Sequence, residues 1–165
     1  MPEDFAHRDE QLSIIANILA PCLRKEKPSN LFVYGKTGTG KTLSVAHVTS
    51  SLLKLSLQRS LPLSIVSVNC KLRRVADTEY RLIAELCRQL DREVPATGLP
   101  TEEIYSIFTK ALESRGQVVI LVLDEIDYLV AKAGSGILYN LTRINSQLKN
   151  TQLSIVGISN DLMFT

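Results

Sequence analysis

Apolar residues recur along the chain in two patterns, and each pattern predicts a different kind of element. Runs of about four to eight aliphatic residues without strict alternation are typical of strands that are buried on both faces. Apolar residues spaced three and four positions apart indicate amphipathic helices. The predicted strands are Leu31–Tyr34, Leu63–Val68, Val118–Leu123 and Leu153–Ile158. The predicted helical stretches cover residues 12–19, 43–57, 82–90, 104–112 and 137–148.

The order of these elements predicts the fold class. Strands that alternate with helices form a parallel sheet with helices on both faces, so we predict an α/β domain. Pro21 is expected to kink or restart the first helix, because proline interrupts the helical hydrogen-bond pattern. Thr101 is expected to cap the helix at 104–112, with acidic residues in the positively charged first turn. The segment 93–100 predicts a turn-rich joint between two helices.

A glycine-rich segment follows the first predicted strand and precedes a helical stretch. It fits the pattern GxxxxGK[ST], in which glycines allow a sharp turn that aims several backbone N–H groups at one anion. We therefore predict a phosphate-binding loop in which Lys41 reaches the β- and γ-phosphates of a nucleotide and the Thr42 hydroxyl binds Mg²⁺. The loop consists of Gly35, Lys36, Thr37, Gly38, Thr39, Gly40, Lys41 and Thr42.

Acidic residues directly follow the third predicted strand. Asp124 and Glu125 would lie at the carboxyl edge of a parallel sheet, where ligands bind in folds of this kind. There Asp124 would hold Mg²⁺ through water, and Glu125 would accept a proton from an attacking water as a general base. Asp127 is expected to cap the next turn or support the site. The alternative, a solvated acidic turn after a core strand, is weakened by the phosphate-binding loop upstream.

The fourth predicted strand ends in polar residues, Ser159-Asn160-Asp161. If this strand lies between the first and the third, Asn160 projects between the phosphate-binding loop and the acidic pair. Its amide would then orient the attacking water or contact the γ-phosphate. The residues alone support the alternative equally well, in which Asn160 is simply a turn residue that ends a strand.

Composition and net charge exclude some classes of protein but identify no partner. The 165 residues, 45% hydrophobic and 22% charged, suit one globular domain and exclude a disordered chain. A formal net charge of +2 neither requires nor excludes nucleic acid. No apolar run approaches the roughly 18 residues of a membrane span, and the acidic start suits no signal peptide, so we expect a cytoplasmic protein without a membrane partner. The three cysteines lack metal-binding spacing and are expected to be unmodified thiols.

Together these motifs resemble an AAA+ ATPase. Finer features are similar to one clade, the archaeal replication initiators related to the origin recognition complex and the cell division control proteins. The resemblance spans essentially the whole chain, and the last two segments that carry it are the most specific to the clade. These segments are residues 5–12 (FAHRDEQL), 27–42 (KPSNLFVYGKTGTGKT), 68–70 (VNC), 138–145 (LYNLTRIN) and 157–162 (GISNDL).

The resemblance implies further roles and partners. His7 and Arg8 match the family's N-terminal box and are expected to help enclose adenine, while Asn160 takes the place of the first sensor residue. The implied cofactors are ATP or ADP with Mg²⁺. The implied partners are origin double-stranded DNA, the replicative helicase and other initiator subunits. The family's slow hydrolysis makes the bound nucleotide a marker of state, so the resemblance implies an archaeal, nucleoid-associated ATP/ADP switch with weak ATPase activity.

The family also carries a helical insertion after the second strand, which contacts DNA near the minor groove. By resemblance this insertion maps to about Lys71–Pro100. Its first part carries basic residues that would meet DNA phosphates. An equally supported alternative is a solvated basic face beside a helix. The residues concerned are Lys71, Arg73, Arg74 and Arg81.

The sequence ends at Thr165, before parts that the resemblance implies. The family continues with an arginine that reaches a neighbouring subunit's nucleotide, a fifth strand, a helical lid and a winged-helix DNA-binding domain. With the family's strand order 5-1-4-3-2, the strand Leu31–Tyr34 is expected at an open edge. We therefore expect a partial AAA+ domain with reduced hydrolysis and DNA affinity. Two alternatives are an AAA+ remodelling or transposition-type ATPase and a nucleotide-binding assembly remnant without turnover.

Overall fold

The computed structural model describes residues 2–24, 30–35, 40–61, 63–72, 78–95, 97–114, 116 and 118–160, and the side chains in these ranges except those of residues 2–9 and 11. The strands are β1 (Leu31–Tyr34), β2 (Leu63–Asn69), β3 (Val118–Asp124) and β4 (Gln152–Ser159). The helices are α1 (Pro2–Leu19), α2 (Lys41–Gln58), α3 (Glu79–Gln89), α4 (Thr101–Glu113), α5 (Ile126–Ala133) and α6 (Gly136–Arg143). Two short 3-10 helices are η1 (Ala20–Arg24) and η2 (Ile144–Gln147).

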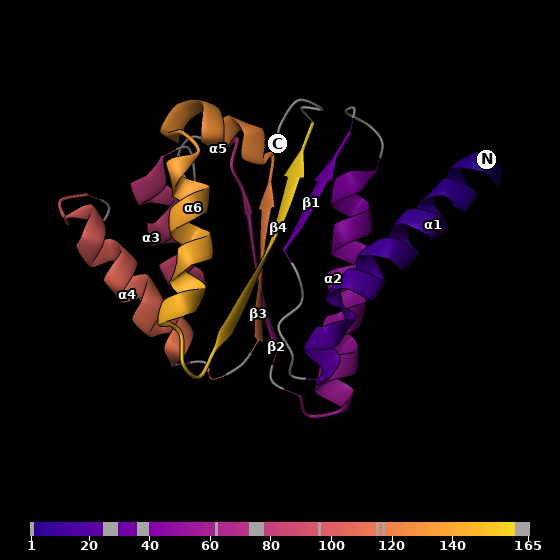
Figure 1. Ribbon diagram of the computed structural model, residues 1–165, viewed down its shortest axis with the longest axis horizontal. Coiled ribbons are helices and arrows are strands. Elements are labelled where there is room, and N and C mark those ends of the chain that lie inside the picture. Colours follow the sequence, from indigo (N-terminus) through magenta and orange to yellow (C-terminus); the bar gives the residue numbers. More distant parts are fainter. Residues whose placement is uncertain are drawn as a thin grey trace.

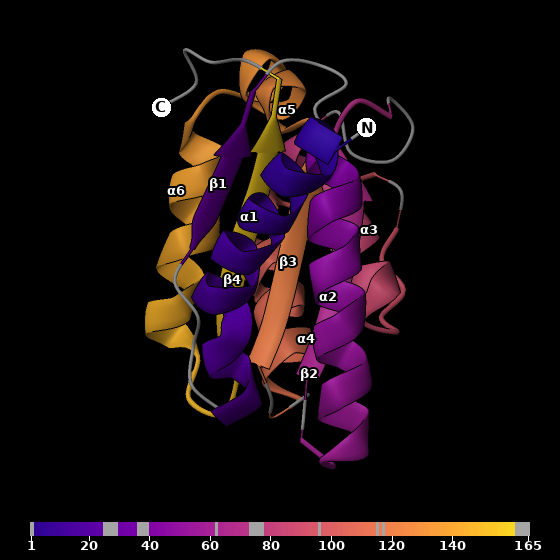
Figure 2. The ribbon, with the colours of Figure 1, turned by 90° about the vertical axis from the view of Figure 1, so that its right-hand side faces the viewer.

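The strands form one parallel sheet in the order β1-β4-β3-β2. This confirms the predicted α/β class and the order of these strands, with β1 at an edge. Helices α1 and α2 cover one face of the sheet, α3, α4 and α6 cover the other, and α5 lies across the strand ends (Figure 1). The turned view shows α1 and α2 side by side in front of the sheet (Figure 2). Among the described helices, none is long and apolar enough to span a bilayer.

Alternating side chains of the two central strands build a separate core on each face of the sheet. Successive strand residues point to opposite faces. Ile120 and Val156 therefore pack with α1 and α2, whereas Leu121 and Ile155 pack with the helices of the other face. Because both faces are covered, these strands are almost continuously apolar in sequence. The two central strands thus form a largely apolar platform, and β3 ends in the acidic residue Asp124.

Two helix boundaries test the local predictions. Helix α1 ends at Leu19 and continues as η1 through Pro21, which confirms the expected interruption. The prediction that Thr101 caps α4 is wrong, because Thr101 is the first helical residue and Pro100 occupies the cap position. The ring of Pro100 fixes its φ, here −59°, and its carbonyl accepts the hydrogen bond from the Ile104 N–H at 3.2 Å. The helix therefore begins one residue earlier than predicted.

Candidate nucleotide-binding site

A cavity of about 340 Å³ opens at the carboxyl edge of the sheet, beside the start of α2. In parallel sheets covered by helices, ligands bind at this edge. The strand ends gather there at the top of the molecule, where α5 crosses the sheet (Figure 1). The structure thus brings together residues that lie more than 100 positions apart in the sequence. The cavity is lined by Gly40, Lys41, Thr42, Leu43, Asn69, Asp124, Glu125 and Asn160.

Lys41 is a buried cation in this cavity. It is the first residue of α2, is only 6% exposed, and donates a hydrogen bond from Nζ to the Gly35 carbonyl oxygen at 3.0 Å. Gly40 has φ 78° and ψ 18°, a left-handed conformation that glycine adopts without steric cost, and the chain turns there into the helix. The amino end of the 18-residue helix adds a partial positive charge. This end of the cavity therefore favours an anion.

Thr42 and Asp124 form a pair of oxygen atoms suited to a small hard cation. The Thr42 hydroxyl donates to Asp124 Oδ2 at 2.8 Å, and Asp124 Oδ1 accepts from the Glu125 N–H at 2.9 Å. Mg²⁺ prefers oxygen ligands, and hydroxyl and carboxylate oxygens are among those it takes in proteins. These two residues therefore fit a magnesium ion in the chemistry of their oxygen atoms.

Glu125 lies between β3 and α5 in an unusual backbone conformation. Its φ of 53° and ψ of 45° are left-handed, which a residue with a Cβ rarely adopts and which costs about 1–3 kcal/mol. The turn ends the strand abruptly and starts α5 one residue later, with Glu125 half-buried on the cavity wall. A carboxylate held on the wall of a cavity can meet a small reactant such as water.

Two asparagines line the same cavity from neighbouring strand ends. Asn160 follows β4, which lies between β1 and β3. This strand order is the condition for the prediction that Asn160 projects between the phosphate-binding loop and the acidic pair. Asn69 ends β2, is in register with Asp124, and accepts a hydrogen bond from the Lys71 N–H on Oδ1 at 2.8 Å. Asn69 is not among the residues that the sequence predicts for the site. The signal that found Asn160, a polar residue at a strand's carboxyl end, would also have found Asn69.

A buried thiol directly after β2 stays neutral. Burial raises the pKa of Cys70 to about 12, with smaller contributions in the same direction from the charges of Asp124, Asp127 and Glu125. These carboxylates therefore gather around the end of β2, where the Cys70 N–H donates to the Asp124 carbonyl oxygen at 2.8 Å. A thiol with so high a pKa is a poor nucleophile and a poor metal ligand. Within the described ranges, no group of three or more histidine, cysteine and acidic residues is placed to hold a metal.

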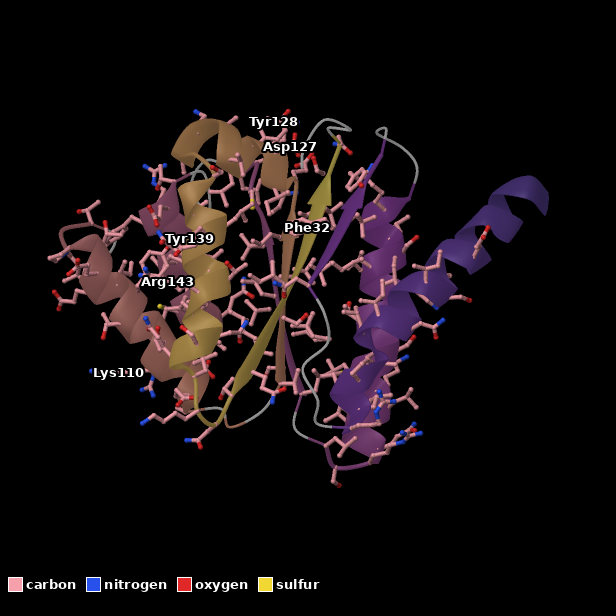
Figure 3. All side chains as sticks on the ribbon, viewed as in Figure 1. Phe32, Lys110, Asp127, Tyr128, Tyr139 and Arg143 are labelled. Carbon is pink, nitrogen blue, oxygen red and sulfur yellow. The ribbon has the colours of Figure 1, made fainter. Side chains whose placement is uncertain are left out.

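Some residues that the sequence predicts for the site lie outside the described residues, and for others only the backbone is described. Lys36, Thr37, Gly38, Thr39, Arg73 and Arg74 lie outside the described residues. His7 and Arg8 belong to α1, but their side chains are not described. Lys71 and Arg81 are both exposed, and the Lys71 ammonium lies 5.2 Å from the centroid of the Tyr128 ring. This contact joins the start of the predicted insertion to α5, whose residue Tyr128 is labelled in Figure 3.

A buried lysine at the start of a helix, preceded by glycine and facing a threonine–aspartate pair, defines the class of P-loop nucleotide-binding proteins. The domain family described as AAA domain matches residues 24–162, and the chain belongs to this family. The structure is similar to that of the Aeropyrum pernix ORC1 protein in complex with DNA, with a TM-score of 0.85 and 40% sequence identity over 96% of this chain and 40% of that one.

Sequence comparison leads to the same group of proteins. The chain is 47% identical over 167 residues to an ORC1-type DNA replication protein of Pyrococcus horikoshii, and 48% identical over 164 residues to an ORC1-type DNA replication protein 1 of Methanosarcina acetivorans. Each match covers 99% of this chain and 39% of the relative. These findings confirm the resemblance to archaeal replication initiators. The chain spans about two-fifths of the length of these relatives.

Proposed function

We propose that the protein is the ATP-binding part of a DNA replication initiator, in which the exchange of ATP for ADP switches the recognition of origin DNA and the loading of the replicative helicase. The observation that carries the proposal is the 2.8 Å contact between Thr42 and Asp124, which joins the start of α2 to the end of β3 at one cavity. High identity to ORC1-type DNA replication proteins supports the initiator role over other uses of such a cavity.

The phosphates of ATP would bind at the amino end of α2. Lys41 Nζ, which now donates to the Gly35 carbonyl oxygen, would turn to the β- and γ-phosphates, because a phosphate oxygen is the stronger acceptor for a buried ammonium. The backbone N–H groups of the loop from Gly35 to Thr42 would surround the same phosphates. Burial strengthens these contacts relative to water, so nucleotide binding is the first function the geometry supports.

Thr42 and Asp124 would hold Mg²⁺, Thr42 through its hydroxyl and Asp124 directly or through water. When bound, the ion neutralises charge on the β- and γ-phosphates. The protein's own contribution is to hold the two oxygens side by side at the cavity before the nucleotide arrives. The Glu125 N–H contributes by fixing the Asp124 carboxylate in place.

Glu125 and Asn160 would act at the γ-phosphate end of the cavity. Glu125 would accept a proton from the attacking water, and the Asn160 amide would orient that water or contact the γ-phosphate. Asn69, on the opposite side of Asp124 from β4, supplies another amide to the same wall. We expect the resulting ATPase to be weak, so that the bound nucleotide marks a state of the initiator.

The base of the nucleotide would lie in a groove between α1 and α2. This groove, of about 450 Å³, shares the lining residue Leu43 with the phosphate cavity, so the two adjoin at that side chain. Ser44 lines the groove and is only 3% exposed, and its hydroxyl has no hydrogen-bond partner within the described part of the chain. His7 and Arg8 of α1 are the residues proposed to close over adenine.

The segment that follows β2 would contact DNA phosphates through Lys71, Arg73, Arg74 and Arg81. The exposure of Lys71 and Arg81 supports this role, and so does the similarity to the Aeropyrum pernix ORC1 protein, whose structure is a complex with DNA. Replacing both Arg73 and Arg74 by alanine is expected to weaken DNA binding and to lower the slope of log K against log salt by up to about 2, because each phosphate contact contributes about 0.9. Fluorescence anisotropy at several salt concentrations measures both quantities.

A matched control for that experiment removes two exposed cations from the far end of α2. Lys54→Ala combined with Arg59→Ala changes the net charge by the same amount and should leave the salt slope as it is. An equal slope for the Arg73→Ala, Arg74→Ala variant and the parent would instead assign the segment to a solvated basic face.

The switch itself is tested by the DNA affinity of ATP-loaded and ADP-loaded protein, measured with origin DNA from a genome that encodes a close relative. We expect the two affinities to differ by about fivefold or more, in line with typical coupling energies, and ATP turnover to stay slow when DNA is added. Equal affinities would contradict the switch. Sustained turnover stimulated by DNA would identify a remodelling or transposition-type motor instead.

A further inference from the structure

The tip of β4 extends beyond its pairing with β3. The two strands pair from Val118 and Gln152 to Leu123 and Gly157, so the described part of β3 offers no register partner for Ser159. On its other side the tip is still paired, since Tyr34 of β1 is in register with Ser159 and the Gly35 N–H donates to the Ser159 carbonyl oxygen at 3.3 Å. On the side of β1, the backbone thus holds the residues that lead to Asn160.

A side chain of α5 provides a contact on the open side of this tip. The Ser159 hydroxyl donates to Asp127 Oδ1 at 3.2 Å, and Ser159 is only 2% exposed. Asp127 lies in the first turn of α5, two residues after Glu125, and Figure 3 places it at the strand ends. The contact therefore joins the element that carries Glu125 to the strand that carries Asn160.

The face of β4 that carries Ser159 is closely packed. Gly157 lies on this face, and a Cβ at its position would lie 2.8 Å from the Phe32 ring and 3.2 Å from Ile126 Cδ1. Ile158, which points the opposite way, is packed in the core with α1 and α2. Asn160 comes directly after Ser159, outside the strand, and lines the phosphate cavity beside the start of α2. The direction of Asn160 thus depends on how the preceding residues are anchored.

We propose that Asp127 and Ser159 are positioning residues whose hydrogen bond fixes the direction in which Asn160 enters the nucleotide cavity. The inference rests on the proposed role of Asn160 at the γ-phosphate. Asp127 belongs to the turn that begins beside Glu125. The same bond therefore also fixes the Glu125 carboxylate and the Asn160 amide relative to each other. The β-phosphate contact proposed for Lys41 and the Mg²⁺ ligand proposed at Thr42 both come from α2 and do not depend on this bond.

The test compares dissociation constants for ADP and for a non-hydrolysable ATP analogue, measured by isothermal titration calorimetry on the same protein preparations. The ratio of the two constants reports contacts to the γ-phosphate alone. Asp127→Ala and Ser159→Ala should each lower the preference for the ATP analogue about five- to tenfold, the size expected for weakening one hydrogen bond to a charged group, and leave ADP affinity within about twofold. Asp127→Asn should keep the parent ratio, because the asparagine Oδ1 still accepts the Ser159 hydroxyl.

Double variants show whether the bond acts through Asn160. Asp127→Ala with Ser159→Ala should lower the ratio no further than either change alone, and Asp127→Ala should have no effect on the ratio in an Asn160→Ala background. Ser146→Ala is the control for loss of a hydroxyl, since Ser146 Oγ donates to the Arg143 carbonyl oxygen within its own turn. Should Asp127→Ala fail to fold, Ser159→Ala provides the same comparison.

Three results would overturn the proposal: a parent-like ratio for Ser159→Ala, an effect of Asp127→Ala that persists without Asn160, or an Asp127→Asn variant as impaired as Asp127→Ala. The proposed function fails separately, since it requires that the parent protein bind ADP and that Asn160→Ala lower the ratio.

Discussion

Replacing Lys41 by alanine is expected to lower the affinity for ATP about a hundredfold or more. The substitution removes a buried cation from the phosphate end of the cavity, and hydrogen bonds to charged groups contribute about 1.5–3 kcal/mol each. The strands and the core helices keep their contacts, because Lys41 lies at the start of α2 and its known acceptor is a loop carbonyl. Isothermal titration calorimetry measures the affinity, and far-UV circular dichroism is expected to stay unchanged.

Lys54→Ala is the matched control for this substitution. Lys54 is an exposed lysine in the same helix, about three to four turns from the cavity, so its loss changes the charge equally and should leave ATP affinity unchanged. Equal ATP affinity of the Lys41→Ala variant and the parent would contradict the assignment of the phosphate-binding loop.

Replacing Glu125 by glutamine is expected to separate binding from hydrolysis. Glutamine has nearly the same size but cannot accept a proton from water, and loss of general-base catalysis typically costs about 10²–10⁴-fold in rate. We therefore expect ATP affinity within about twofold of the parent and phosphate release slowed at least about a hundredfold. A single-turnover assay of phosphate release from protein-bound ATP measures the rate without interference from slow ADP release.

Glu102→Gln, an exposed position in the first turn of α4, controls for the loss of one carboxylate and should not change the rate. Hydrolysis that persists in the Glu125→Gln variant would assign the base to another group. A parent protein that binds ATP but shows no turnover would instead support the alternative of a nucleotide-binding assembly remnant.

The sequence predicted the sheet, and the strand and helix on either side of the candidate phosphate-binding loop, because these depend on local patterns. Strands covered on both faces are continuously apolar, and each predicted strand agrees with the structure to within one residue at either end. The pattern GxxxxGK[ST] indicates a phosphate-binding loop only when it lies between a strand and a helix, and β1 and α2 provide that context. Asp124, Glu125 and Asn160 followed from the rule that the carboxyl ends of parallel strands share one edge.

Features that depend on tertiary geometry could not be predicted in this way. The left-handed backbone at Glu125 is imposed by the turn from β3 into α5, since glutamate has no preference for that conformation. The bond between Ser159 and Asp127 depends on how far β4 extends beyond β3, which only the register shows. The cation–π contact between Lys71 and Tyr128 likewise joins segments that are adjacent only in the fold.

The central claim is that one site at the carboxyl edge of the sheet binds ATP and a divalent cation. A crystal structure of the protein with Mn²⁺ and a non-hydrolysable ATP analogue tests it most directly, because the anomalous signal of manganese locates the cation independently of the surrounding atoms. We expect one strong anomalous peak beside Thr42 Oγ1 and Asp124, with the γ-phosphate within hydrogen-bond distance of Lys41 Nζ. A cation or a triphosphate bound anywhere else on the molecule would contradict it.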